Sequence, residues 1–248
     1  MINILESSCF SFSKSSEQLN QDSMLPVRKV SEGIIFGVAD GLGAYKGAEK
    51  ASSIATCYLE KLKNKEETLN FEKVFSDILK EIMDISIANK DYVNASTTLT
   101  YCFIDNAGIY IGHIGDCRLY MKSSNKLIQM TKDHTKHQKY LDDKLFTKSQ
   151  LKNVRGKNVI TTAISQIAPM NYENYFIPYD ELHVDTKNNI SLYIMSDGMY
   201  HFWEKIPRFS EQTMDSVVRF GSSLQRRVQR YGAIDDYTFI GCKFNVIR

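Results

Sequence analysis

Residues 38–52 read VADGLGAYKGAEKAS, and residues 193–203 read YIMSDGMYHFW. In both stretches a run of strand-forming apolar residues ends on an Asp-Gly pair, the first at Asp40 and the second at Asp197. Asp-Gly is a common turn dipeptide, so a turn alone explains one such pair. A strand end fixes the backbone while the side chain meets solvent, and two carboxylates in this position indicate a functional role.

The residues around these pairs predict an α+β fold. Segments rich in Ile, Val, Thr, Tyr and Phe predict strands at 34–40, 96–105, 108–116, 117–122, 190–197 and 237–246. Residues 99–121 are expected to form a meander with a turn at DNAG. Helices are predicted at 47–63, 71–90 and 210–230, the second with apolar residues at three-to-four spacing. Long helices followed by a meander favour a layered sandwich over a parallel doubly wound sheet.

Composition narrows the class of protein. The 248 residues carry 31 basic and 29 acidic side chains, a net charge of +2, which gives no support to a nucleic-acid or membrane surface. We read one domain over 1–248, with a polar, mobile surface flap at about 131–160 that contains a short helix. Scattered cysteines argue against disulfides and zinc and fit a reducing compartment: Cys9, Cys57, Cys102, Cys117 and Cys242. We therefore expect a cytoplasmic protein, monomeric by default.

Further acidic residues flank predicted strands in the same way as the first pair. They are Asp22, Asp116, Asp235 and Asp236. A hard cation such as Mg²⁺ or Mn²⁺ prefers oxygen ligands, and an Asp followed by an exposed carbonyl supplies two of them. If folding brings these side chains together, the carboxylates repel one another unless cations neutralise them. Other chemistries lack their motifs, since the chain has no P-loop, no G-x-S-x-G and no H-E-x-x-H.

An ordered series of motifs resembles a known family. The series is NQDS, VADGLGAYKGAEKAS, STTLTYCFID, IGDCRLYMKSSNKLIQMTKDHT, GKNVITTAIS, YIMSDGMY and DDYTFIG. In this order the motifs resemble the metal-dependent Ser/Thr protein phosphatases of type 2C, the PPM family, in their short bacterial form. The resemblance runs from about residue 20 to residue 240, nearly the whole chain.

The resemblance implies a fold and a metal centre. The fold is a four-layer α-β-β-α sandwich, with two central antiparallel sheets flanked by antiparallel helices. The centre holds two Mn²⁺ or Mg²⁺ ions, with Asp40 as the bridging carboxylate and Gly41 as donor of a backbone carbonyl. Asp197 and Asp235 are similar to the remaining direct ligands.

It also implies supporting roles around that centre. Asp116, together with Asp197, is similar to the ligands of a third, weaker ion that bacterial members often show. Asp22 is expected to hold metal-bound water. Asp236 stands where the family usually has Asn and is expected to orient its neighbours, while Gln21 replaces the commoner Glu in the outer shell.

The implied activity is hydrolysis of phosphoserine and phosphothreonine in proteins, the substrates of a Ser/Thr kinase, by activated water without a phosphoenzyme. One departure concerns the substrate phosphate. The family usually carries an Arg five residues before the position of Asp22, and this chain has Glu17 there. Lys14 is the nearest cation, but Lys lacks the bidentate fork of Arg. An alternative is therefore a catalytically weak regulatory module that binds phosphoproteins.

Overall fold

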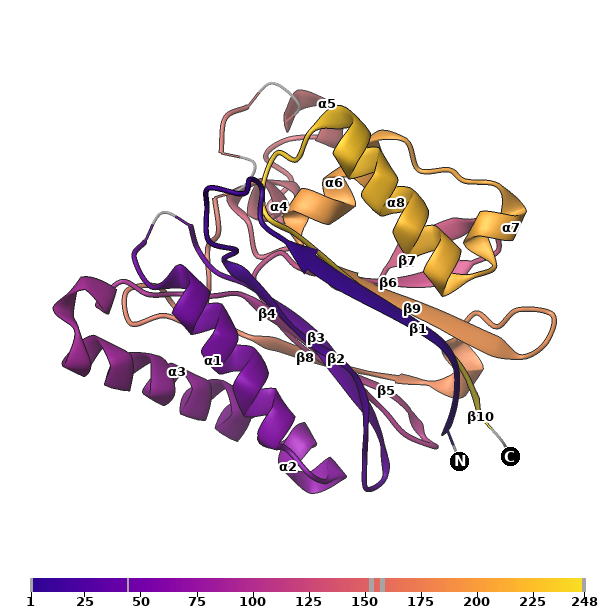
Figure 1. Ribbon diagram of the computed structural model, residues 1–248, viewed down its shortest axis with the longest axis horizontal. Helices are drawn as coiled ribbons and strands as arrows, with labels where there is room; N and C mark the ends of the chain where they lie inside the picture. Colours follow the sequence, from indigo (N-terminus) through magenta and orange to yellow (C-terminus); the bar gives the residue numbers. More distant parts are fainter. Residues whose placement is uncertain (1, 44, 152–153, 157–158, 247–248) are drawn as a thin grey trace.

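The protein is a sandwich of two antiparallel sheets between two layers of helices (Figure 1). The computed structural model describes residues 2–43, 45–151, 154–156 and 159–246. One sheet has the strand order β1 (Ile2–Phe12), β10 (Tyr237–Val246), β9 (Asn189–Met195), β6 (Arg118–Ser123) and β7 (Lys126–Gln129). The other has the order β2 (Asp22–Val30), β3 (Gly33–Asp40), β4 (Leu99–Ile104), β5 (Gly108–Ile114) and β8 (Glu173–Pro178).

Helices cover the outer face of each sheet. The sheet of β2–β3–β4 is covered by α1 (Ala48–Lys61) and α3 (Phe71–Ala88), with the short α2 (Lys65–Leu69) between them. The sheet of β1, β10 and β9 is covered by α6 (Asp197–Lys205) and α8 (Val217–Tyr231), which the short α7 (Glu211–Met214) precedes. Two short 3₁₀ helices lie at Lys90–Tyr92 and Tyr179–Glu181. The expected four-layer sandwich is confirmed.

The alternation of side chains along β3 shows how the layers are built. Ile34, Phe36 and Val38 point to the other sheet and belong to the core between the sheets. Ile35 and Ala39 point the opposite way and pack under α1 and α3. Both faces of this strand are buried, which explains its continuous apolar run.

Several element boundaries differ from the expectation. The strand predicted at 190–197 ends at Met195, and Asp197 begins helix α6 instead. The meander predicted for 99–121 is only partly correct, because β4 and β5 pair but β6 pairs with β9 and β7 in the other sheet. The helix predicted at 210–230 is two helices, α7 and α8, separated by Asp215 and Ser216.

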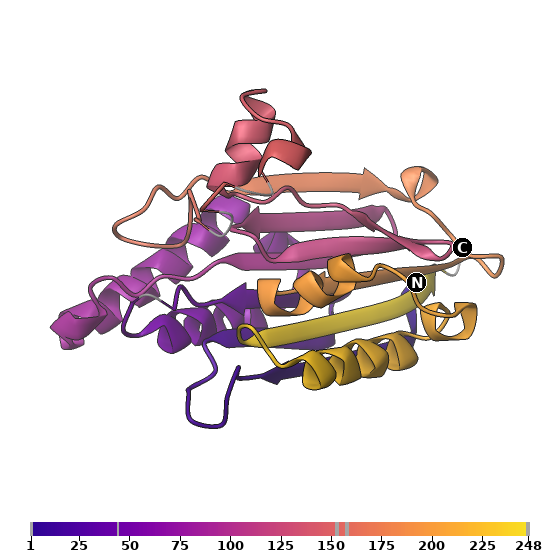
Figure 2. The same cartoon turned by 90° about the horizontal axis from the view of Figure 1, so that it is seen from above.

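Four strands and two helices were not predicted. They are strands β1, β2, β7 and β8 and helices α2 and α6. The segment expected as a flap with one short helix carries two, α4 (Lys136–Asp142) and α5 (Lys148–Leu151), and projects from the edge of the sandwich (Figure 2). In the described ranges, no helix has the length and apolar character that crossing a membrane requires.

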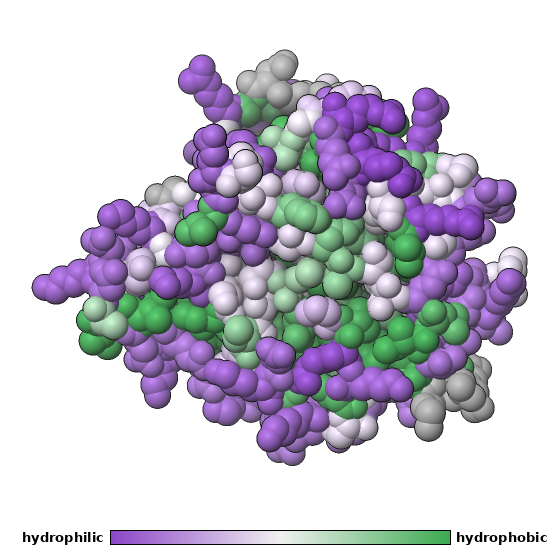
Figure 3. All heavy atoms as spheres, in the orientation of Figure 1, coloured by the Kyte–Doolittle hydropathy of each residue, from purple (hydrophilic) through white to green (hydrophobic). Residues whose placement is uncertain are grey.

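The molecular surface follows the layers. Figure 3 shows hydrophilic side chains over the helical layers and hydrophobic surface mainly between them, over the strands. Strand β1 carries two exposed apolar side chains, with Leu5 42% and Phe12 44% exposed. Single exposed apolar residues of this kind are normal on a protein surface.

Candidate functional site

The first two predicted site residues lie opposite one another. Strands β2 and β3 pair so that Asp22 is in register with Asp40 at the same end of the sheet. The residues just before β4 hold the main chain of Asp40 in place. Its carbonyl accepts hydrogen bonds from Thr98 N (2.8 Å) and Thr97 Oγ1 (3.0 Å). The sheet therefore delivers two carboxylates, 18 residues apart in the sequence, to one point.

Gly41 is a position where only glycine fits. Its amide donates to the carbonyl of Gln21 at 3.0 Å. A Cβ here would lie 2.4 Å from the carbonyl oxygen of Ala48 and 2.8 Å from that of Gln21. The backbone of the Asp40-Gly41 turn is thus held between β2 and the start of α1, at the end of the sheet.

Ser196 connects the second sheet to this point. Its Oγ donates to Asp22 Oδ2 at 2.7 Å and accepts from Thr238 N at 2.9 Å. Asp197 follows directly as the first residue of α6. One buried hydroxyl therefore links the end of β9, the start of β10 and the carboxylate on β2.

Asp235 and Asp236 precede β10 on the same side of the molecule. Asp236 accepts two backbone hydrogen bonds, from Lys14 N at 2.7 Å on Oδ1 and from Gln21 N at 2.6 Å on Oδ2. Asp235 Oδ1 accepts from the amide of Asp236 at 2.9 Å. The two carboxylates of Asp236 and Asp235 thus differ, since only Asp236 has both oxygens occupied by amides.

Asp116 lies on the connection by which the chain passes from β5 in one sheet to β6 in the other. The preceding Gly115 has φ +105°, a conformation that favours glycine. Its amide donates to His134 Nδ1 at 3.1 Å, and the amide of His134 donates to its carbonyl at 2.8 Å. The segment that contains His134 therefore holds this turn in place. The contact between Gly115 and His134 was not predicted from the sequence.

The ends of both sheets enclose a small cavity of about 160 Å³, which we call the acid cleft. Its lining is Gln21, Asp40, Gly41, Leu42, Gly43, Asp116, Ile160, Asp197, Asp235 and Asp236. Asp22 lies beneath it, 6% exposed. Among these described lining residues five are Asp and none is Lys or Arg, so the cleft concentrates negative charge.

Burial and mutual repulsion raise the pKa values of these carboxyls. The pKa of Asp22 is raised to about 7, mainly by burial and further by Asp197 and Asp236, against the hydrogen bonds from Ser196 and Thr238. The pKa of Asp40 is raised well above its ordinary value by burial and then by its acidic neighbours Asp22, Asp197, Asp116 and Asp235. Burial, followed by Asp197 and Asp133, raises that of Asp116. The predicted carboxylates therefore lie close enough to affect each other's protonation.

The donor set fits a hard divalent cation. Asp22 Oδ1 is buried and, within the described part of the chain, has no hydrogen-bond partner. The same described residues contain no group of three or more His, Cys, Asp or Glu side chains arranged to hold an ion by themselves. Mg²⁺ uses one or two carboxylates and keeps several waters, so an open acidic cleft suits it better than a closed cage of protein ligands.

The remaining predicted residue lies at the rim. The amide of Lys14 is bonded to Asp236, but its side chain is exposed and does not line the acid cleft. Sequence reasoning missed Ser196 and the Thr97–Thr98 pair, although SDG and STT stand beside the residues that it selected. In the sequence, a Ser or Thr close to a selected Asp could have indicated these hydrogen-bonding residues.

Sequence comparison relates the chain to phosphatases. The pattern of the family described as Protein phosphatase 2C matches residues 13–234. The serine/threonine phosphatase stp of Listeria welshimeri is 24% identical over 226 residues, which cover 85% of this chain and 84% of that protein.

Solved structures share the fold. Serine/threonine phosphatase Stp1 from Staphylococcus aureus superposes with a TM-score of 0.78 at 18% identity, covering 99% of this chain and 96% of that one. The catalytic domain of serine threonine protein phosphatase PstP, in complex with two manganese ions, gives a TM-score of 0.72 at 19% identity, covering 99% of this chain and all of that one.

Proposed function

The chain belongs to the protein phosphatase 2C family, and on this premise we propose that its acid cleft hydrolyses phosphoserine and phosphothreonine in proteins. The observation that carries the proposal is the meeting of carboxylates from both sheets in one cleft whose described lining has no Lys or Arg. A phosphate dianion is repelled by such a cleft until cations occupy it. The cleft is therefore built to bind cations first and phosphate second.

Two Mn²⁺ or Mg²⁺ ions are assigned to the acid cleft. Asp40 would be their shared carboxylate ligand, Gly41 would add its carbonyl oxygen, and Asp197 and Asp235 would supply the remaining carboxylates. Support comes from the all-oxygen donor set and from the two manganese ions of the related PstP domain. When bound, the ions lower the pKa of the attacking water and draw charge from the phosphoryl oxygens.

The other acidic residues support this arrangement. Asp116, with Asp197, is proposed to hold a third and weaker ion. Asp22 is proposed to accept a hydrogen bond from water in the cleft through Oδ1, the oxygen that its Ser196 contact leaves available. Asp236 has both oxygens occupied by amides, so it orients the 14–21 segment, including Gln21, rather than binding an ion.

The substrate phosphate meets the cleft at its rim. Glu17 occupies the position where an Arg would bind the phosphate with two hydrogen bonds. The Glu17 side chain is exposed. Lys14 is held at the rim by its amide, so we assign its ammonium to the phosphate as a single point charge. We therefore expect a lower affinity for the substrate phosphate than an Arg at this position would give.

The proposed substrates are proteins phosphorylated by a Ser/Thr kinase in the cytoplasm, bound by a monomer. The alternative of a phosphoprotein-binding module that does not turn over is not favoured, because buried carboxylates without a cation destabilise the fold.

One assay tests the function. Purified protein is incubated with a phosphothreonine peptide and with p-nitrophenyl phosphate, in Mn²⁺ and in EDTA. We expect phosphate release in Mn²⁺ and none in EDTA. Saturable peptide binding in Mn²⁺ without release would support the binding module instead, and equal release in EDTA would contradict the assignment of ions to the cleft.

A further inference from the structure

One carboxylate of the acid cleft lies on a turn that begins with glycine. Asp116 follows Gly115, and a glycine backbone is freer to change conformation than that of any other residue. Asp116 is only 4% exposed, and within the described chain no other side chain forms a hydrogen bond with its carboxylate. The direction of this carboxylate therefore depends on how the turn is held.

His134 holds the peptide groups on both sides of Gly115. The amide of Gly115 donates to His134 Nδ1 at 3.1 Å, and the amide of His134 donates to the carbonyl of Gly115 at 2.8 Å. This carbonyl belongs to the peptide bond that leads into Asp116. The turn also packs tightly against Thr98, since a Cβ at Gly115 would lie 2.3 Å from Thr98 Cβ. The backbone that carries Asp116 is thus restricted by contacts with two other segments.

His134 is itself held in place by two further residues. Its carbonyl accepts hydrogen bonds from Thr161 N at 2.8 Å and from Thr161 Oγ1 at 3.0 Å. Its Nε2 lies 3.5 Å from Glu173 Oε2 on β8, and its side chain is 11% exposed. Because Nδ1 accepts the hydrogen bond from Gly115, the ring proton lies on Nε2, the nitrogen near Glu173.

The ring accepts this hydrogen bond because it is neutral. Burial lowers the pKa of His134, against the opposing effect of Glu173 and Asp133. The ring of His113 lies beside it, with 4.7 Å between the ring centres, and burial lowers the pKa of His113 to about 3. The pair of rings is therefore uncharged near pH 7, and Nδ1 of His134 keeps its lone pair for Gly115.

From these contacts we propose that His134 is a positioning residue that holds the carboxylate of Asp116 in the acid cleft before an ion binds there. The inference rests on the proposed function, in which Asp116 and Asp197 hold the third, weaker ion. Without His134, the turn at Gly115 would have to be ordered when the ion binds, which lowers the affinity. Groups that orient a metal ligand typically change metal affinity 10- to 100-fold when they are removed.

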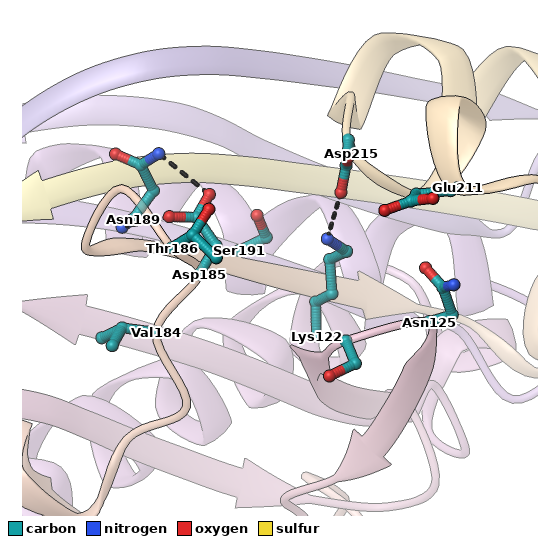
Figure 4. Close-up of a pocket in the computed structure, with 10 residues that line it drawn as sticks. Lys122, Asn125, Val184, Asp185, Thr186, Asn189, Ser191, Glu211 and Asp215 are labelled. Atoms are coloured by element: carbon teal, nitrogen blue, oxygen red, sulfur yellow. Dashed lines mark hydrogen bonds and ion pairs between the residues drawn. The ribbon is translucent and has the colours of Figure 1, made fainter.

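A similar backbone contact far from the acid cleft provides a structural control. Beyond the other end of β9 from Asp197, Asp185 Oδ1 accepts hydrogen bonds from Lys187 N at 2.7 Å and from Asn189 N at 2.9 Å. Figure 4 shows Asp185 and Asn189 at a hollow of about 280 Å³, where the Asn189 side chain donates to Asp185 Oδ2 at 2.9 Å. The described lining of this hollow shares no residue with the acid cleft. Asp185 thus holds a turn as His134 does, but not a turn that carries a cleft carboxylate.

The test compares two amide variants of the full chain. In His134→Asn the Oδ1 atom takes the position of Nδ1 and can accept from the Gly115 amide, whereas His134→Gln moves the acceptor one carbon further out. The EPR signal of free Mn²⁺ measures how much Mn²⁺ each variant binds. We expect the unmodified chain to bind two ions tightly and a third more weakly. His134→Gln should bind the weaker ion about tenfold less tightly, and His134→Asn should bind it nearly as the unmodified chain does.

Two further measurements separate positioning from general stability. Asp185→Ala should lower Tm and leave every Mn²⁺ affinity unchanged. In EDTA, the Gly115 amide should exchange its hydrogen faster in His134→Gln than in His134→Asn, which reports on the turn without any metal. If His134→Gln does not fold, Thr161→Val replaces it, because this variant removes only the Oγ1 hydrogen bond to the His134 carbonyl and should weaken the same ion.

Three results would overturn the proposal. They are equal Mn²⁺ affinities of the variant that disturbs His134 and of His134→Asn, faster exchange at Gly115 without loss of affinity, and an unmodified chain that binds only two ions. Phosphate release by the unmodified chain in Mn²⁺ measures the proposed function separately. Failure of the proposed function would therefore appear as absent release, and failure of this inference as unchanged binding of the weaker ion.

Discussion

Asp40 is the residue on which the acid cleft depends most. It is half-buried, it faces Asp22 across β2 and β3, and four other acidic side chains raise the pKa of its carboxyl. Asp40→Asn keeps the size of the side chain but removes the charge that attracts both proposed cations. We expect kcat for p-nitrophenyl phosphate in Mn²⁺ to fall by roughly 100-fold or more, as for loss of one central electrostatic group. An initial-rate assay measures it.

The control is Asp180→Asn, which changes an exposed carboxylate and should leave kcat unchanged. If Asp40→Asn retained full activity while folding normally, Asp40 would not hold the ions.

The raised pKa of Asp22 determines how we expect the stability of the metal-free protein to depend on pH. Its pKa in the folded state is about 7, above the ordinary 3.8, so the folded state binds more protons than the unfolded state between these values. Stability without metal should therefore fall as pH rises from about 4 to about 7. Thermal unfolding in EDTA should show Tm decreasing over this range, and Mn²⁺ should restore it near neutral pH. A Tm that rises with pH in EDTA would be inconsistent with a buried, crowded carboxyl.

Lys14 tests how the phosphate is held. Because its ammonium is an exposed point charge at the rim, Lys14→Ala should raise KM for a phosphothreonine peptide by about two- to fivefold and leave kcat nearly unchanged. Lys126→Ala, a lysine on β7, is the matched control. An unchanged KM would remove Lys14 from the site.

At the level of elements, Ser196 is the contact that joins the two sheets. Ser196→Ala removes the hydrogen bond to Asp22 and leaves Thr238 N without its side-chain acceptor. Buried groups left unsatisfied cost about 1–3 kcal/mol, so urea unfolding should show a loss of this size. Ser76→Ala, on the exposed face of α3, should change stability by less than about 0.5 kcal/mol. Equal effects of the two substitutions would show that Ser196 does not link the sheets.

The elements that could be predicted from the sequence are those with strong local patterns. Strand β10 matches its expected bounds of 237–246, and α1 and α3 lie within the predicted helices. Strand β2 was missed because Pro26 interrupts it. As an edge strand with a register shift between Leu25 and Arg28, it tolerates a proline that a central strand does not.

Other elements were missed for different physical reasons. In β1 only alternate residues face the core, and the serines between them hide the apolar pattern. Strand β9 ends at Met195, two residues before the predicted end at 197, and helix α6 begins at Asp197 after the extended Ser196. An Asp-Gly pair after a strand predicts that the chain changes direction there. It does not distinguish a turn from the first turn of a helix.

At the level of the whole molecule, the site is a product of topology. Residues 22, 40, 116, 197 and 235 lie on separate segments, and local patterns do not show which strand ends meet. Their convergence could be expected from the family resemblance, and the strand orders of the two sheets bring them to the acid cleft. The two helices α4 and α5 could not both be expected, because the sequence of the 131–160 segment is weakly periodic.

The central claim is that the acid cleft is a cation site built from both sheets. The most direct measurement is anomalous diffraction from crystals of the protein grown with Mn²⁺. We expect two strong peaks in the acid cleft, within coordinating distance of Asp40, one of them also contacting Asp197. Manganese peaks only elsewhere on the surface, with the cleft carboxylates bridged by protons or water, would contradict it.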